Sequence, residues 1–189
     1  MMKSCLAVLA LALALSGCSL SLPFSGPART VHYYVLSSPA PAAGQLSDAS
    51  IGVLPVTMPG YLSRPQLVVR ESDGVSIRIN DFDRWGEEPS VGVARVLCET
   101  LASLGRSAVP LRSGTQVDSR LMLDVRRLDG PLDGDVTLDA VWTLQKEKKI
   151  LRSGRFVARR AAGPTLESMV EAQSELVQML ARDIAGTLD

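Results

Sequence analysis

The sequence has few aromatic residues, a single histidine and no net charge, and each shortage excludes a class of protein. Aromatic residues make up 4% of the 189 residues, and 20 basic residues balance 20 acidic ones. Because a sequence-independent nucleic-acid binder needs an excess of basic residues, we expect no nucleic-acid partner. The three cysteines are too few for a disulfide-stapled miniprotein, and a domain of about 150 residues buries a core without such bridges.

Residues that carry catalysis or hold metals are also scarce. The sequence contains no G-x-S-x-G nucleophile motif and no glycine-rich phosphate loop. His32 lies in a predicted strand, so a periplasmic esterase that uses it is the weakest hypothesis. The acids Asp81, Asp83, Glu87 and Glu88 lack the calcium-loop pattern, and a zinc site would need more histidine or cysteine ligands. The sequence therefore predicts a protein that is not an enzyme and holds no metal or cofactor.

The amino-terminal segment carries the clearest motif. Lys3 is followed by an apolar run over residues 6–15, which as a helix would span roughly 15 Å, about half of a bilayer's hydrocarbon core. This run is too short for a stable transmembrane helix and is typical of a secretory signal. The Leu15-Ser16-Gly17-Cys18 sequence that follows resembles the bacterial lipobox. Residues 1–17 are therefore predicted to be a cleaved lipoprotein signal peptide.

Cys18 is the predicted lipidation site, and its covalent lipid is the one attached group that we expect. Three acyl chains, as on mature bacterial lipoproteins, would hold the protein firmly on a membrane. By the rule for Gram-negative lipoproteins, Ser19 rather than Asp after the cysteine favours the outer membrane. Residues 18–30 are predicted to be a lipidated tether. Cys98 would remain as a lone thiol in an oxidising compartment, which predicts a buried, structural cysteine.

Hydrophobic periodicity and turn residues predict six or seven strands and two helices in the rest of the chain. The predicted strands cover residues 31–36, 51–56, 67–70, 75–79, 121–126, 136–145 and 150–160. The predicted helices run from residue 89 to Gly105 and from residue 166 to residue 184, the second one capped by Gly163-Pro164-Thr165. Residues 80–88 are predicted to be a polar connection.

The order strands, helix, strands, helix predicts an α+β fold. We expect an antiparallel or mixed β-sheet with two amphipathic helices packed on one face, and residues 31–189 as a single periplasmic domain. The strands after residue 120 are expected to form an antiparallel meander with one solvent-exposed side. Trp142 alternates with apolar neighbours and is predicted to be a core residue.

The candidate binding residues are an aromatic and a cation in one turn and a tryptophan in the polar connection. Tyr61 and Arg64 belong to a turn rich in proline, and Trp85 lies beside Arg84. Aromatic residues and arginine in loops are typical anchors of protein interfaces. For Trp85 the sequence leaves two interpretations open, an interface anchor and a plug at the edge of the core.

Four segments carry a resemblance to a known family. They are Tyr33-Tyr34-Val35-Leu36, Ile51-Gly52-Val53-Leu54-Pro55-Val56, the run from Pro59-Gly60-Tyr61 through Gln66-Leu67-Val68, and Asp83-Arg84-Trp85 leading into the first helix. In this order they resemble the ABC-type transport auxiliary lipoproteins of the PqiC/YmbA type. The resemblance covers most of residues 31–189. Gly86-Glu87-Glu88-Pro89 departs from the smaller, more apolar step usual after the tryptophan.

The resemblance implies a function that composition alone does not indicate. It implies a lipoprotein at the periplasmic face of the outer membrane, held there by its lipid anchor. Its expected partner is a PqiB-like MCE-domain protein of an intermembrane lipid transport system, whose tip it would receive, with a ring of identical subunits as one arrangement. The alternative is an assembly or stabilising lipoprotein for another envelope complex.

Overall fold

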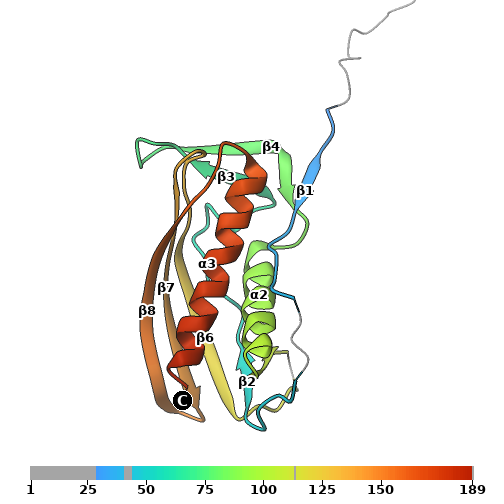
Figure 1. The fold of residues 1–189 in the computed structure, drawn as a ribbon, viewed down its shortest axis with the longest axis vertical. Helices are drawn as coiled ribbons and strands as arrows, with labels where there is room; N and C mark the ends of the chain where they lie inside the picture. Colours follow the sequence, from blue (N-terminus) through green and yellow to red (C-terminus); the bar gives the residue numbers. More distant parts are fainter. Residues whose placement is uncertain (1–28, 41–43, 113, 189) are drawn as a thin grey trace, which may run out of the picture. The chain divides into compact units, whose positions relative to one another are not determined.

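Two β-sheets and two helices make up the part of the chain that the computed structural model describes, residues 29–40, 44–112 and 114–188. The predicted signal peptide, Cys18 and most of the predicted tether lie outside these residues. The elements belong to one compact unit, Val31–Asp189 (Figure 1).

The larger sheet has five strands in the order β5-β2-β6-β7-β8. The strands are β2 (Ser50–Val53), β5 (Ser107–Pro110), β6 (Ser119–Asp129), β7 (Asp135–Lys146) and β8 (Lys149–Ala161). β2 pairs in parallel with both β5 and β6, whereas β6, β7 and β8 form the predicted antiparallel meander. Strand β5 was not predicted, because four residues containing a proline give too short a pattern. Trp142 on β7 is 2% exposed, which confirms that it is a core residue.

The smaller sheet has three strands in the order β1-β4-β3, namely β1 (His32–Tyr34), β4 (Ile77–Trp85) and β3 (Gln66–Arg70). β3 and β4 form the predicted hairpin, with Gly74 at a φ of 74° in its turn. The prediction of a polar connection over residues 80–88 was wrong, because β4 continues to Trp85. Polar residues form a strand here because β4 is the central strand and pairs with a neighbour on each side.

Two helices cover one face of the larger sheet, as predicted (Figure 1). Helix α2 (Pro89–Ser103) begins with a proline, which has no amide to leave unpaired, and is followed by Gly105 at a φ of 78°. Helix α3 (Leu166–Gly186) begins after Thr165, whose side chain accepts a hydrogen bond from the Ser168 amide at 3.2 Å. The predicted α+β fold class is therefore confirmed.

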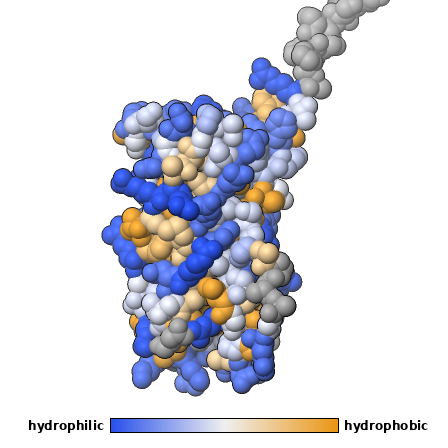
Figure 2. Space-filling model, in the orientation of Figure 1, coloured by the Kyte–Doolittle hydropathy of each residue, from blue (hydrophilic) through white to orange (hydrophobic). Residues whose placement is uncertain are grey.

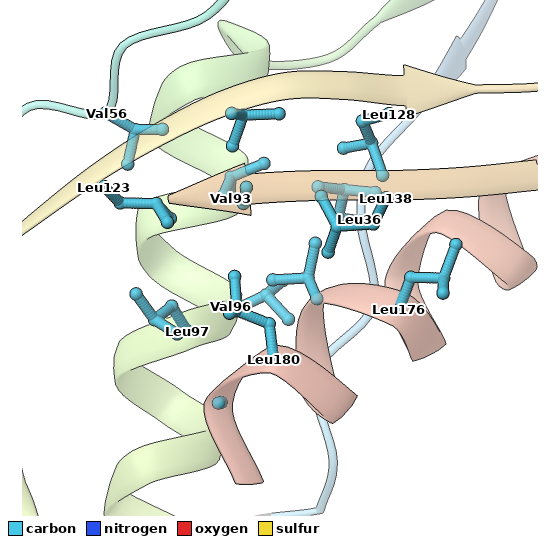
Figure 3. Close-up of a cluster of buried hydrophobic side chains, with 14 of the residues drawn as sticks. Leu36, Val56, Val93, Val96, Leu97, Leu123, Leu128, Leu138, Leu176 and Leu180 are labelled. Atoms are coloured by element: carbon cyan, nitrogen blue, oxygen red, sulfur yellow. The ribbon is translucent and has the colours of Figure 1, made fainter. Parts of the chain in front are cut away.

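The core lies between the helices and the sheet (Figure 3). Leu97 of α2, Leu176 and Leu180 of α3, and Leu138 of β7 are fully buried in it. Burying each such leucine stabilises the fold by about 1.5–3 kcal/mol relative to an exposed side chain. Cys98 is buried and unpaired, as predicted, and burial raises the pKa of its thiol to about 12.

The surface of the helix-covered face is mixed in character. Hydrophobic residues form separate patches there, divided by hydrophilic ones (Figure 2). Neither helix in the described residues combines the length and the apolar character needed to cross a membrane.

Candidate functional site

A groove of about 330 Å³ opens where the end of β4 meets the start of α2. Its lining residues are Ser63, Arg64, Pro65, Trp85, Gly86, Glu87, Glu88 and Pro89. The Trp85 amide donates to the Pro65 carbonyl at 2.7 Å and joins the two walls, and the Gly86 amide donates to the Tyr34 carbonyl of β1, also at 2.7 Å. The fold thus makes neighbours of two short segments that are well separated in the sequence.

A tight turn presents the first of these segments. The carbonyl of Pro59 accepts hydrogen bonds from the amides of Leu62 at 2.9 Å and Ser63 at 3.1 Å. The side chain of Leu62 is 7% exposed and packs into the core. Because Leu62 fixes the turn from below, Ser63 and Arg64 are held at the rim of the groove.

Arg64 lines this groove and has one unsatisfied polar atom. Its Nε is buried and finds no hydrogen-bond acceptor among the described residues. A buried donor that lacks a partner costs about 1–3 kcal/mol, and more when the group is charged. The Arg64 side chain on the groove wall therefore carries a charge and a buried N–H group that is not paired within the described residues.

Trp85 belongs both to the groove and to the edge of the core. It also lines a small internal cavity of about 20 Å³, together with residues such as Leu36, Leu62 and Val93. The side chain is half-buried and packs against the core cluster. The two interpretations left open by the sequence are thus compatible, because Trp85 both closes the core and lines the groove.

Glu87 on the groove wall is tied to helix α2. Arg95 Nη2 donates to Glu87 Oε1 at 2.6 Å and to the Leu36 carbonyl at 2.7 Å, and Nη1 donates to Ser38 Oγ at 3.1 Å. The hydrogen bond to Glu87 is the main cause that raises the pKa of Arg95. Arg95 therefore clamps the segment after β1 against α2 and fixes one wall of the groove.

Tyr61 lies apart from the groove, in a cluster around the fully buried Asp129. Tyr61 donates its hydroxyl to Asp129 Oδ2 at 2.6 Å, and Arg70 donates to both carboxylate oxygens at 2.8 and 2.9 Å. Arg127 Nε adds a further hydrogen bond at 2.8 Å. Burial acts to raise the pKa of Asp129, but these hydrogen bonds outweigh burial and lower it. The structure thus brings Arg64 and Trp85 together and engages Tyr61 in holding β3 against the end of β6.

A second groove was not predicted from the sequence. It has a volume of about 520 Å³ and runs between the end of β2 and the first half of α2. Its lining is largely apolar and includes Val53, Pro55, Val91, Ala94 and Leu111. Glu88 lines both grooves, so they meet at the start of α2. The walls of this second groove come from three segments that are distant in the sequence. No local sequence pattern predicts that these segments lie side by side.

The acidic residues at the end of β4 and just after it have different partners. Asp83 accepts a hydrogen bond from Tyr34 at 3.2 Å and lies 3.3 Å from His32 Nδ1, whereas Glu87 pairs with Arg95. Within the described ranges, no three His, Cys, Asp or Glu side chains are grouped so that they could hold a metal ion.

The fold and the groove define an α+β domain of two mixed sheets with an open, partly apolar surface site. Its sequence from residue 34 to residue 185 matches the model of the ABC-type transport auxiliary lipoprotein component family. Because the match covers most of the chain, the protein belongs to this family of lipoproteins, which are auxiliary components of ABC-type transport. No curated protein matches this sequence.

Two solved structures share the fold. A crystal structure of an uncharacterized protein matches with a TM-score of 0.72 and 21% identity, over 85% of this chain and 100% of the other. A protein from Xanthomonas campestris matches with a TM-score of 0.66 and 16% identity, over 85% of this chain and 94% of the other.

Proposed function

We propose that this lipoprotein is a docking subunit of an MCE-type intermembrane lipid transport system. Lipidated Cys18 would anchor it at the periplasmic face of the outer membrane, where it would receive the tip of a PqiB-like MCE-domain protein. The role is one of binding rather than catalysis, and several copies in a ring would present several docking sites.

Membership of a transport auxiliary family supports this proposal. The groove lined by Arg64 and Trp85 is the proposed docking site. The observation that carries the docking role is Arg64, whose buried Nε lacks an acceptor among the described residues and lies beside the half-buried Trp85. Arginine and tryptophan are the residues that most often dominate interface energies, especially in partly enclosed pockets. A carboxylate or carbonyl of the partner would satisfy Arg64 while an apolar side chain packs on Trp85.

Co-purification tests the proposal. The tagged full-length chain is extracted from native membranes in mild detergent, and retained proteins are identified by mass spectrometry. We expect an MCE-domain protein to be retained by the parent, and its recovery to fall at least about tenfold for Arg64→Gln, since a lost charged hydrogen bond costs about 1.5–3 kcal/mol. Arg78→Gln is the matched control, because Arg78 is an exposed arginine of β4 outside the groove. Failure of the parent to retain any MCE-domain protein would contradict the proposal.

A further inference from the structure

The turn between β7 and β8 concentrates one kind of charge in an otherwise neutral chain. Residues 146–152 read Lys-Glu-Lys-Lys-Ile-Leu-Arg and carry four cations against one anion. The sequence has four lysines, of which one lies in the predicted signal peptide and the other three lie in this turn. Elsewhere in the predicted mature chain every cation is arginine, so this segment, here called the lysine tip, differs chemically from the rest of the surface.

The lysine tip combines exposed charge with exposed apolar side chains. Lys148 and Lys149 are exposed and form no ion pair within the described residues. Lys146 is also exposed. Together with the hydrogen bonds from Ser50, its positive charge lowers the pKa of Asp118 on the neighbouring loop. Directly after the lysines, Ile150 is 61% exposed and Leu151 is 37% exposed. Free cations beside free aliphatic groups form an amphipathic surface.

The residues at the lysine tip are not those that its turn geometry favours. Lys146 pairs with Lys149, so that Glu147 and Lys148 form a two-residue turn, and Glu147 has a φ of 55°. Such turns favour glycine, asparagine or aspartate where φ is positive, and a different residue there stores strain. Glu147-Lys148 is therefore a poor turn sequence at a place where charge is dense.

The lysine tip lies at the far end of the fold from the strand that leads to the predicted anchor. β6 begins beside it, since Arg120 pairs with Gln145, and ends at Asp129. There the Arg70 amide donates to the Gly130 carbonyl and joins the smaller sheet, which contains β1, to the larger one. Figure 1 shows the β7–β8 turn at one end of the fold, and β1 and β4 at the other. The twelve residues of β7 separate the two ends by roughly 40 Å.

We propose that the lysine tip binds the surface of an anionic phospholipid bilayer. The lysines would approach the phosphate and glycerol headgroups, and Ile150 and Leu151 would enter the boundary with the acyl chains. Basic side chains close to an anionic bilayer each strengthen its binding several-fold, and neighbouring apolar groups add to this. The site goes beyond the proposed docking role, because it involves the opposite end of the domain and a lipid rather than a protein.

The lysine tip has two other possible roles, protection of a sheet edge and binding of an acidic protein. Each of them explains fewer of its features than binding of a bilayer does. Basic residues on an edge strand protect it from pairing with other chains, and Arg155 and Arg159 on β8 suit that purpose. Edge protection does not explain why Ile150, the most exposed large apolar side chain of β8, lies next to the lysines. An acidic protein would satisfy the cations, but neither of the two grooves reaches this turn to receive its side chains. A fluid lipid surface needs no groove.

Vesicle co-sedimentation tests the inference without the lipid anchor or a protein partner. The chain is produced from Ser19 onward, which retains every core residue, since the core extends from Leu36 to Ala185. The probes are vesicles of phosphatidylcholine alone and of an equal mixture of phosphatidylcholine and phosphatidylglycerol. We expect binding to the mixed vesicles that weakens with added salt, and a loss of at least about tenfold when Lys146, Lys148 and Lys149 are all replaced by Gln.

Two variants separate the lysine tip from net charge and from folding. Replacing Arg126, Arg159 and Arg182 by Gln removes the same number of exposed charges elsewhere and should change binding less than about twofold, since long-range attraction is screened. Ile150→Ser should weaken binding while leaving the thermal unfolding midpoint unchanged. Equal binding of the lysine and arginine variants would overturn the inference, as would failure of the parent to bind mixed vesicles at low salt. Capture by an immobilised acidic polypeptide without vesicle binding would also overturn it. None of these outcomes bears on docking of an MCE-domain protein.

Discussion

Asp129 joins the two sheets through a single carboxylate. It is fully buried at the end of β6 and accepts hydrogen bonds from Tyr61, Arg70 and Arg127. The Arg70 guanidinium also lies 5.4 Å from the centre of the Tyr61 ring. A buried carboxylate is stable only when such donors replace the water it has lost. The turn that carries Arg64 is therefore supported through Tyr61 by a residue that is distant in the sequence.

Asp129→Asn should destabilise the protein by about 3 kcal/mol, because it removes one partner of a buried ion pair and leaves Arg70 without its counter-charge. Urea unfolding followed by circular dichroism measures the change. The matched control is Asp139→Asn, which breaks the pair with the exposed Arg155 and should cost less than about 1 kcal/mol. Similar losses in the two variants would show that Asp129 does not have the structural role described.

Tyr61 should make the protein less stable as the pH rises into the alkaline range. Burial, with the hydrogen bond to Asp129, raises the pKa of Tyr61 to about 12, against about 10 in an unfolded chain. Between these values the folded state holds the phenolic proton more tightly, so the free energy of unfolding falls as pH rises from about 10 toward 12. Tyr61→Phe should make this fall shallower, as measured by urea unfolding at several pH values. An unchanged slope would mean that the tyrosine titrates normally in the folded state.

Some residue roles were accessible from the sequence and others were not. Alternation along one strand places Trp142 in the core, because side chains two apart share a face of a sheet. The same reasoning fails for Asp129, since a carboxylate at the end of a strand is normally exposed and its donors come from elsewhere. Arg64 and Trp85 were recognised by residue type as candidate anchors. Their meeting in one groove depends on β4 reaching Trp85, which the sequence did not predict.

At the scale of elements, the confirmed predictions are those for helices and strands with strong hydrophobic periodicity and clear capping or turn residues at their ends. Both helices have apolar stripes and recognisable ends, and the meander has long alternating strands. β1 is shorter than the predicted strand over residues 31–36, and β4 is longer than its predicted counterpart. Both differences arise because pairing partners, rather than local propensity, determine where a strand ends.

The segment after β1 is held by side chains of the two helices rather than by a sheet. Its anchors are Arg95, which donates to the carbonyl of Leu36, and Ser174, whose hydroxyl accepts from the amide of Ser37 at 2.9 Å. Gln178 Nε2 also donates to the Ser37 carbonyl at 3.2 Å. The chain leading from the predicted tether is thereby fixed to both α2 and α3.

Arg95→Met should loosen this segment while leaving the core intact. It removes charged hydrogen bonds to Glu87 and Leu36 and should cost about 1–3 kcal/mol locally. Hydrogen–deuterium exchange measured by mass spectrometry should show faster exchange in peptides covering residues 34–40. The control is Arg159→Met, since Arg159 is an exposed arginine on β8 rather than on either helix. Unchanged exchange in Arg95→Met would mean that the clamp does not hold the segment.

At the scale of the whole molecule, the fold separates its surfaces. The two grooves meet at the start of α2, and the lysine tip lies at the end of the larger sheet remote from β1. The family resemblance found in the sequence is confirmed by the family match. The position of the groove lined by Arg64 and Trp85 could not be derived from sequence patterns, because it depends on how the end of β4 meets the turn before β3.

Site-specific photo-crosslinking from the Arg64–Trp85 groove tests docking most directly. Ser63, an exposed residue of the groove wall, is replaced by a photo-reactive amino acid in the full-length chain, and intact cell envelopes are irradiated. Ser72 in the β3–β4 turn is the matched control position, because it is exposed and lies outside the groove. We expect an adduct with an MCE-domain protein from position 63 and none from position 72. Adducts from position 63 that contain other envelope proteins and never an MCE-domain protein would contradict the account.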